Sequence, residues 1–307
     1  MKQLCRYIGL GASFEIASMT LFADWNRDSR ILLKQPNQGQ LRKHDIMKIP
    51  IYQVDAFASG VFSGNPAAVC MLDAWIDDRM LQSIAAENNL SETAFLVRND
   101  DGFDIRWFTP ATEVALCGHA TLASAYILFT CRKWPAESIR FKTRKSGQLV
   151  VTQRDDLLEL DFPARPASVR TPPAGLGEAL GITPKEVFGS AEDLLVVLDS
   201  QKAVQEVKPD FGALERVACR GAIITARGDQ SDFVSRFFAP GVGVPEDPVT
   251  GSAHCVLIPY WAGVLGKNDL HAFQISKRGG ELFCTHAGDR VKFSGKAVLY
   301  MEGTITI

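Results

Sequence analysis

Three side chains that can exchange a proton stand near two expected helix starts. His119 follows Gly118 at one start, Asp247 precedes Gly251 at the other, and Glu92 lies upstream of both. Glutamate, histidine and aspartate are common carriers in general acid/base catalysis. A helix N-terminus binds an anion through its unpaired N–H groups and its dipole, and a glycine there lets the ligand approach the backbone closely. The pattern predicts proton transfer on a small carboxylate.

Each of the three residues also has a purely structural interpretation. Glu92 follows Ser91 and could be a helix-cap or surface carboxylate. His119 could be a satisfied histidine at a helix start, and Asp247 before Pro248 could be a turn residue. A closed cleft would raise the pKa of a carboxylate, whereas a neighbouring imidazolium would lower it. The joint placement beside two glycines favours the catalytic interpretation.

The chain contains an internal repeat, which is the first sign of its architecture. Residues 106–110 (Arg-Trp-Phe-Thr-Pro) are echoed by residues 236–240 (Arg-Phe-Phe-Ala-Pro). Each segment is followed by an acidic loop and by a helix start with glycine, at residues 117–121 (Cys-Gly-His-Ala-Thr) and 250–254 (Thr-Gly-Ser-Ala-His). The two halves of the chain are therefore interpreted as copies of one unit.

The helix expected after each start is apolar nearly all round, over residues 122–129 and 255–261. A helix without a polar face must be enclosed by other structure, and short strands surround both helices in the sequence. We expect an α+β fold of two pseudo-symmetric domains, each a barrel-like mixed β-sheet wrapped around a central apolar helix. The domains are expected at 47–165 and 166–307, with the last strand a candidate to return to the first half. Pro259 should interrupt and kink the second helix.

A helix and two strands are expected around Glu92. Residues 77–89 combine acidic first-turn residues with an apolar stripe at helical spacing. Residues 93–97 and 105–108 are strand candidates separated by turn residues at 99–102. Glu92 is therefore expected at a junction between a loop and a strand.

Composition excludes several classes of protein. The 307 residues have a hydrophobic share of 46 %, a charged share of 22 % and a net charge of -2, which give no reason to expect nucleic acid or an anionic membrane as partner. No apolar stretch approaches the roughly 18 residues that span a bilayer. The seven scattered cysteines favour a reducing, cytoplasmic compartment. The five histidines lack metal-ligand spacing, so no metal is expected.

Residues 1–46 are interpreted as an N-terminal extension. Glu15 interrupts the partly apolar segment near the N-terminus, and no small-residue cleavage site follows, so a secretion signal is disfavoured. Met47 leads directly into an expected strand at 51–54 and is an alternative start, in which case the first 46 residues are not native.

Five motifs, in the same order along the chain, resemble those of the PhzF-like family of phenazine biosynthesis. They lie at residues 55–57 with 64–66, 89–95, 108–110 with Glu113, 117–121 and 246–253. The resemblance extends from Met47 to Ile307. It implies the fold of diaminopimelate epimerase, an active site between the two halves, a homodimer and no cofactor. In the phenazine-pathway member, the reaction is an isomerisation of a dihydro-hydroxyanthranilate by proton transfer.

The same resemblance implies roles for individual residues. Glu92 corresponds to the acid/base glutamate, and the assisting residues are His119, Asp247 and Ser252. The residues expected to bind the substrate are Asn65, Gly118, Gly251 and Ser252. We therefore predict a cofactor-free isomerase that transfers a proton on a small carboxylate.

Two alternatives stay open. Epimerases related to diaminopimelate epimerase use two opposed cysteines; Cys117 resembles the first, but Thr250 stands in the place of the second. A hydroxyl is far too weak an acid to replace a thiol at neutral pH, which argues against an amino-acid racemase and favours Cys117 as a buried structural residue. The other alternative is a non-catalytic protein that binds a small anion and has a regulatory role.

Overall fold

Short strands alternate with helices from Ile46 onward. The computed structural model describes residues 46–307, so the predicted extension at 1–46 lies outside the described residues except for its last residue. The strands of the first half are β1 (Lys48–Ala56), β2 (Asn65–Leu72), β3 (Glu92–Asn99), β4 (Gly102–Phe108), β5 (Glu113–Val114), β6 (Ser138–Thr143), β7 (Gln148–Arg154) and β8 (Leu157–Pro163). Its helices are α1 (Asp78–Asn88) and α2 (Gly118–Tyr126), and α2 continues as a π-helical turn, η2 (Ile127–Cys131).

The second half repeats this order of elements and adds several short ones. Its strands are β9 (Ser168–Val169), β10 (Glu186–Gly189), β11 (Asp193–Val197), β12 (Gly221–Arg227), β13 (Phe233–Ala239), β14 (Val244–Asp247), β15 (Asp269–Gln274), β16 (Gly280–Ala287) and β17 (Arg290–Gly295). Its helices are α3 (Leu176–Leu180), α4 (Gln201–Glu206), α5 (Phe211–Leu214), the short η3 (Pro240–Val242) and α6 (Gly251–Leu265).

The two halves also share their strand pairing. In the first half, β3 is parallel to β2 and antiparallel to β4, β6 is parallel to β4, and β7 and β8 follow antiparallel. In the second half, β12, β11, β13, β15, β16 and β17 repeat these relations one for one. The short strands β5 and β14 pair with β4 and β13 at the corresponding point. The structure thus confirms the predicted α+β fold of two pseudo-symmetric halves.

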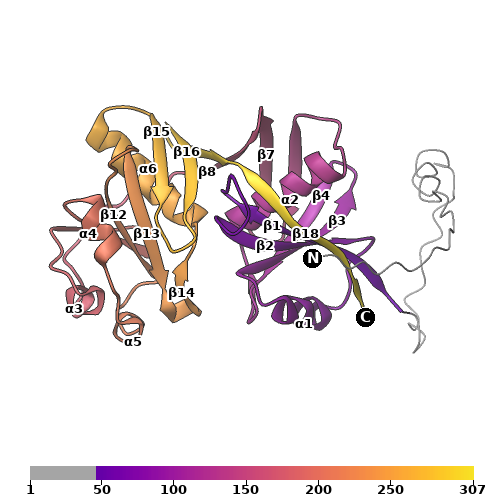
Figure 1. Ribbon diagram of the computed structural model, residues 1–307, viewed down its shortest axis with the longest axis horizontal. Coiled ribbons are helices and arrows are strands. Elements are labelled where there is room, and N and C mark those ends of the chain that lie inside the picture. Colours follow the sequence, from indigo (N-terminus) through magenta and orange to yellow (C-terminus); the bar gives the residue numbers. More distant parts are fainter. Residues whose placement is uncertain (1–45) are drawn as a thin grey trace, which may run out of the picture. The chain divides into compact units, whose positions relative to one another are not determined.

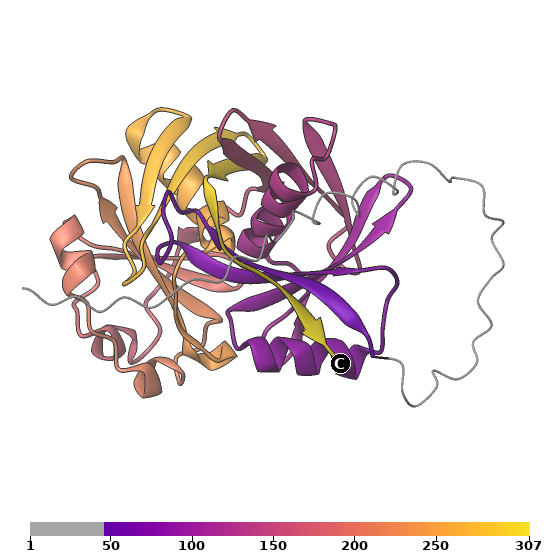
Figure 2. The ribbon, with the colours of Figure 1, turned by 45° about the vertical axis from the view of Figure 1, so that its right-hand side comes forward.

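Two strand pairings join the halves into one sheet. β8 of the first half lies antiparallel to β17 of the second. The last strand, β18 (Ala297–Thr306), leaves the second half and pairs antiparallel with β1, from Lys48 opposite Thr306 to Ala56 opposite Ala297. Figures 1 and 2 show this yellow strand lying along the indigo β1. The chain therefore closes the first half with its last residues.

The central helices are enclosed, as their composition predicts. Residues 119–125 of α2 are all buried. In α6, residues 253–258 are all buried and Trp261 and Ala262 are buried as well. The sheet of each half supplies the enclosing apolar side chains. Because neither helix has a polar face, each forms only within its sheet.

The prediction for Pro259 is wrong in one respect, because α6 runs from Gly251 to Leu265 without interruption. A proline has no N–H group for the carbonyl four residues before it, which here is that of Cys255. That carbonyl accepts a hydrogen bond from the backbone N–H of Arg165 at 2.9 Å. The segment between the two halves thus satisfies the group that Pro259 leaves free.

The arginines of the repeated motif have a structural role. Arg106 donates through Nε and Nη2 to the two carboxylate oxygens of Glu113, at 2.8 and 2.9 Å. Arg236 makes the same bidentate contact with Glu246, at 2.7 and 3.0 Å. A bidentate pair of this kind fixes geometry as well as charge. Both pairs hold the loop that leads from the motif to a central helix.

Helix α1 has the boundaries that its sequence predicts. Asp77 caps its N-terminus by accepting a hydrogen bond from the Arg79 backbone N–H at 2.9 Å, and Asn89 ends it with a left-handed φ of 49°. Within the described residues, no helix is both long and apolar enough to cross a membrane.

Candidate active site

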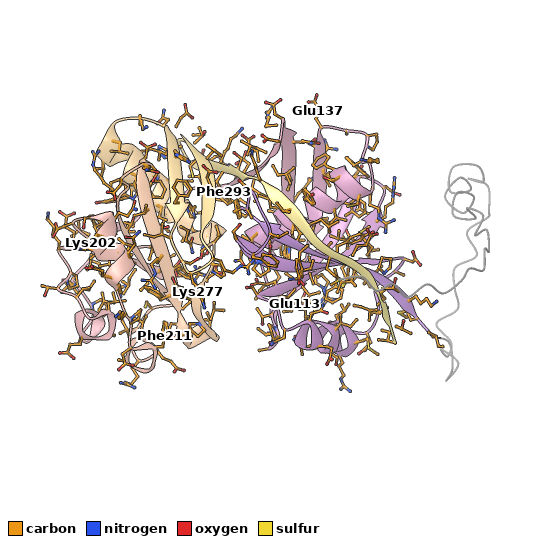
Figure 3. All side chains as sticks on the ribbon, in the orientation of Figure 1. Glu113, Glu137, Lys202, Phe211, Lys277 and Phe293 are labelled. Atoms are coloured by element: carbon orange, nitrogen blue, oxygen red, sulfur yellow. The ribbon has the colours of Figure 1, made fainter. Side chains whose placement is uncertain are left out.

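The N-termini of α2 and α6 meet at Gly118 and Gly251. A Cβ atom on Gly118 would lie 3.7 Å from the Cα of Gly251, and one on Gly251 would lie 3.6 Å from the Cα of Gly118. Phe293 packs against both positions and lies where the two halves meet (Figure 3). Two positive helix ends in contact repel each other unless negative charge lies nearby. The contact therefore creates a site that favours anions.

Glu92 and His119 form an ion pair beside these helix ends. Oε2 of Glu92 lies 3.1 Å from Nε2 of His119, and the two side chains are 16 % and 6 % exposed. Glu92 is the first residue of β3 and pairs with Ala67 of β2, while His119 is the second residue of α2. Glu92 thus occupies the loop-to-strand junction expected for it, and a strand and a helix N-terminus position the pair.

The surroundings of His119 favour the imidazolium. Burial alone would lower the pKa of His119, but its contacts with Cys117 and Glu92 outweigh burial and raise the pKa well above its ordinary value. Burial raises the pKa of the Cys117 thiol to about 11, so this thiol is neutral at pH 7. The negative charge that matters is therefore that of the Glu92 carboxylate.

Asn65 connects the two halves of the site. Its Nδ2 atom lies 2.7 Å from Oδ1 of Asp247, 2.9 Å from the Val249 carbonyl and 3.2 Å from Nδ1 of His119. The first two partners are acceptors, which orients the amide group with its nitrogen toward them. Oδ1 of Asn65 is buried and has no hydrogen-bond partner among residues 46–307. The site therefore contains an unused acceptor close to His119.

Asp247 is held close to His119 by a buried network that the sequence did not indicate. Thr250 donates its hydroxyl to Oδ2 of Asp247 at 2.6 Å. Gln274, which is fully buried, accepts from the Thr250 N–H at 2.8 Å and donates to the Asp247 carbonyl at 2.7 Å. Burial raises the pKa of Asp247 to about 6, and the charge of His119 opposes this rise. Asp247 is thus a second carboxylate that can change protonation near neutral pH.

Ser252 lies apart from the contacts that join Asn65, His119 and Asp247. Its hydroxyl oxygen accepts a hydrogen bond from Nη2 of Arg220 at 3.1 Å, and Arg220 is not among the candidates that the sequence suggests. The strand register of the internal repeat could have identified Arg220, since the residue directly precedes β12 as Ser91 precedes β3. No comparable signal existed for Gln274.

Three side chains of the site also have positions that could hold a metal ion. Donor atoms of Glu92, Cys117 and His119 lie within 4.8 Å of one another. A metal would require Cys117 as the thiolate, and the raised pKa of its thiol opposes that form. The cluster is therefore better suited to holding protons.

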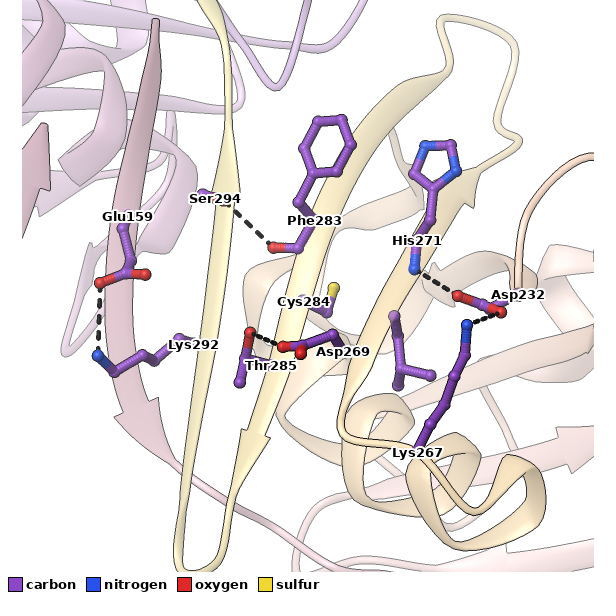
Figure 4. A pocket seen from close by; sticks show the side chains of 11 residues that line it. Glu159, Asp232, Lys267, Asp269, His271, Phe283, Cys284, Thr285, Lys292 and Ser294 are labelled. Atoms are coloured by element: carbon purple, nitrogen blue, oxygen red, sulfur yellow. Dashed lines mark hydrogen bonds and ion pairs between the residues drawn. The ribbon is translucent and has the colours of Figure 1, made fainter. Parts of the chain in front are cut away.

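A separate cavity of about 350 Å³ lies on the outer face of the strands that connect the two halves. Figure 4 shows its lining, which includes Glu159, Asp232, Lys267 and Lys292. Each lysine is paired with a carboxylate there, Lys267 with Asp232 at 2.6 Å and Lys292 with Glu159 at 3.5 Å. The cavity contains none of the predicted site residues.

Comparison with known proteins gives one consistent result. Residues 54–303 match the family model described as phenazine biosynthesis-like protein. An uncharacterized isomerase of Pseudomonas aeruginosa is 56 % identical over 261 residues, which cover 85 % of this chain and 100 % of that protein. The crystal structure of a PhzF-family protein of Enterococcus faecalis has a TM-score of 0.82 at 44 % identity and covers 84 % of this chain and 99 % of that one.

A more distant structure shares only the fold. The hydroxyproline epimerase of Agrobacterium vitis, solved with trans-4-hydroxy-L-proline, has a TM-score of 0.55 at 11 % identity, over 85 % of this chain and 93 % of that one. The epimerase-like architecture of two similar halves is thereby confirmed. With the family match and the high identity to a protein named as an isomerase, this chain belongs to the phenazine biosynthesis-like (PhzF) family and is an isomerase of that family.

Proposed function

We propose that the protein is a cofactor-independent isomerase that moves a proton on a small carboxylate substrate, with Glu92 as the acid/base residue. The observation that carries this proposal is the 3.1 Å contact between Glu92 and His119 beside two converging helix N-termini. The contact supplies a proton carrier, and the helix ends supply an anion site.

In the proposed reaction, the Glu92 carboxylate removes a proton from a carbon of the substrate and returns it to another carbon. The negative charge that develops between these steps is stabilised by the N–H groups at the starts of α2 and α6 and by the His119 imidazolium. Asp247, with its pKa raised to about 6, can hold or release a further proton. Each proton transferred in these reaction steps is carried by a side chain of the described site.

Racemisation is the less favoured alternative. A two-base racemase needs a proton carrier on each face of the reacting carbon. Thr250 caps α6 at the position where Cys117 caps α2, and its hydroxyl is already donated to Asp247. A threonine hydroxyl is too weak an acid or base for that role.

The proposal is tested by NMR in deuterated water with wild-type protein and Glu92→Gln. A panel of small carboxylates should include dihydro-hydroxyanthranilate and several amino acids. We expect deuterium incorporation or isomerisation of at least one compound by the wild type. The rate should fall by about 100-fold or more in Glu92→Gln, as for the loss of a general acid/base.

Glu87→Gln is the matched control, because Glu87 is an exposed carboxylate on α1. The control should keep the wild-type exchange rate. Full exchange by Glu92→Gln would overturn the role of Glu92. Binding of the panel without exchange by the wild type would instead support a protein that only binds small anions.

We also propose that the protein is a homodimer in the cytoplasm. The six cysteines within residues 46–307 are unpaired, which suits a reducing compartment. Phe62 and Tyr300 form an exposed aromatic pair, 5.7 Å between ring centres, beside the edge strand β18. Exposed aromatic side chains on an edge strand are suited to contact with another subunit.

A further inference from the structure

The internal repeat places a cation one residue before the position at which its other copy has the acid/base residue. Phe108 of β4 pairs with Thr93, and the equivalent Phe238 of β13 pairs with Ala222. The register thus makes Gly221, the first residue of β12, the counterpart of Glu92, the first residue of β3. Arg220 stands immediately before that counterpart.

The helix starts differ in the same way. Gly118 and Gly251 are equivalent, so Ser252 of α6 is the counterpart of His119 of α2. In the first copy, Glu92 contacts His119 at 3.1 Å; in the second, Nη2 of Arg220 lies 3.1 Å from Oγ of Ser252. The start of the central helix therefore adjoins a proton-transfer pair in the first half and a pair of hydrogen-bond donors at adjacent or equivalent positions in the second.

Asp193 fixes the guanidinium of Arg220. Nε donates to Oδ1 of Asp193 at 2.9 Å, and Nη2 donates to Oδ2 of the same carboxylate. Asp193 is only 2 % exposed and begins β11, the neighbour of β12 in the sheet. A bidentate contact to a buried carboxylate orients the planar guanidinium and reduces the entropy lost when it binds a ligand.

Arg220 has guanidinium N–H groups without a protein partner among the described residues, unlike the two structural arginines of the repeat, Arg106 and Arg236. In Arg106 and in Arg236, all three guanidinium nitrogens donate hydrogen bonds, and the side chains are 4 % and 13 % exposed. Nη1 of Arg220 donates to no residue within 46–307, and the side chain is 32 % exposed. Arg220 therefore keeps an oriented and accessible pair of N–H donors next to the start of α6.

We propose that Arg220, together with Ser252, binds the carboxylate of the substrate, so that the second half of the molecule recognises the anion while the first half transfers the proton. This inference rests on the proposed function. It names the residues that recognise the carboxylate group of the proposed substrate. The carboxylate can accept one hydrogen bond from Nη1 of Arg220 and one from the Ser252 hydroxyl, and the fixed guanidinium plane sets the direction of the first.

The test measures binding by saturation-transfer NMR with anthranilate and its neutral amide, anthranilamide, and then with the other carboxylates of the panel and their amides. Wild-type protein should prefer the carboxylate. Arg220→Gln should weaken carboxylate binding by about tenfold or more, which corresponds to the loss of a charge-assisted hydrogen bond, and should leave amide binding nearly unchanged. Arg220→Lys should restore part of the preference.

Two further variants separate recognition from folding. Arg220→Gln leaves Asp193 buried without its partner, so the double variant Arg220→Gln/Asp193→Asn removes both charges and should fold like the wild type while lacking the carboxylate preference. Arg290→Gln removes an arginine paired with Asp161 on the outer face and should retain the preference.

The outcomes also distinguish this inference from the proposed function. Glu92→Gln should still prefer the carboxylate although it no longer exchanges deuterium. The role of Arg220 would be overturned if Arg220→Gln kept the preference for carboxylate over amide, or if the wild type showed no such preference for any carboxylate and its amide. Either result would count whether or not deuterium exchange depends on Glu92. Exchange that is independent of Glu92 would overturn the proposed function alone.

Discussion

The chemistry of the site depends on a small group of mutually dependent charges. Glu92 and Asp247 are both carboxylates close to His119, and Asn65 donates to Asp247 while it contacts the imidazole. The imidazolium stabilises the negative charge of its neighbours, and they stabilise the imidazolium in turn. A change in one of these residues should therefore alter the protonation of the others.

This dependence predicts how stability varies with pH. The Glu92 carboxylate opposes the effect of burial on His119, and the pKa of the folded imidazole is raised well above 6.5. A raised pKa contributes stability that is complete below the unfolded value of about 6.5 and is lost as pH rises through the folded value. The free energy of unfolding should therefore fall with pH above about 6.5.

Chemical unfolding of wild type, His119→Asn and Glu92→Gln between about pH 6.5 and pH 8 measures this effect, because the buried thiols, whose pKa values are also raised by folding, affect stability mainly above this range. The decline of the unfolding free energy with pH should be absent in His119→Asn. It should be smaller in Glu92→Gln, by about 1.4 kcal/mol for each unit by which the pKa shift of His119 is reduced. A decline of the same size in all three proteins would show that other groups cause it.

Residue types and spacing were sufficient to select Glu92, His119, Asp247 and the two glycines as candidates, because helix starts and acid/base residues leave local signals. Residues that act through contacts distant in the chain leave no such local signal in the sequence. Gln274 is 27 residues from Asp247 in the chain and reaches it only because β15 lies beside β13. The role of Arg220 likewise depends on the pairing of β11 with β12.

At the scale of elements, the contact between α2 and α6 is the feature that builds the site. Helix α1 and strands β3 and β4 could be predicted because their apolar periodicity is strong, and the uninterrupted course of α6 through Pro259 could not. A proline removes one hydrogen bond, but tertiary contacts decide whether the helix continues. Here the N–H of Arg165 takes that bond.

The two glycines at this contact should differ in their tolerance of a methyl group. A Cβ on Gly251 would lie 3.2 Å from Cζ of Phe293, whereas a Cβ on Gly118 would meet nothing closer than 3.7 Å. Gly251→Ala should therefore destabilise the protein by about 1–3 kcal/mol, in the range of an overpacked core, and Gly118→Ala by less. Urea unfolding of the two variants gives the comparison, and equal losses would contradict it.

At the scale of the whole molecule, the repeat predicts two similar halves because its motifs recur at corresponding places. It does not predict which strands join them. The antiparallel pairing of β8 with β17 and of β18 with β1 depends on edges that exist only after each half has assembled. Such long-range pairings leave no periodic signal in a single segment of sequence.

The proposed homodimer is tested on the exposed aromatic pair at β18. The side chain of Phe62 is 71 % exposed, so Phe62→Asp should leave the fold intact while it weakens an apolar contact between subunits. Light scattering should give twice the chain mass of 33.6 kDa for the wild type and a smaller mass for Phe62→Asp at the same concentration. A wild-type protein that is monomeric at every concentration would exclude the dimer.

The pairing of β18 with β1 has a consequence for synthesis on the ribosome. β1 is the first described strand to emerge and β18 is the last, so β1 must wait for one of its two neighbours until nearly the whole chain has been made. Domains usually fold as units while the chain grows, the N-terminal one first. In this protein the first half can assemble most of its sheet early but completes it only after β18 has left the ribosome, and during that interval the open edge of β1 is exposed to chaperones and to other chains.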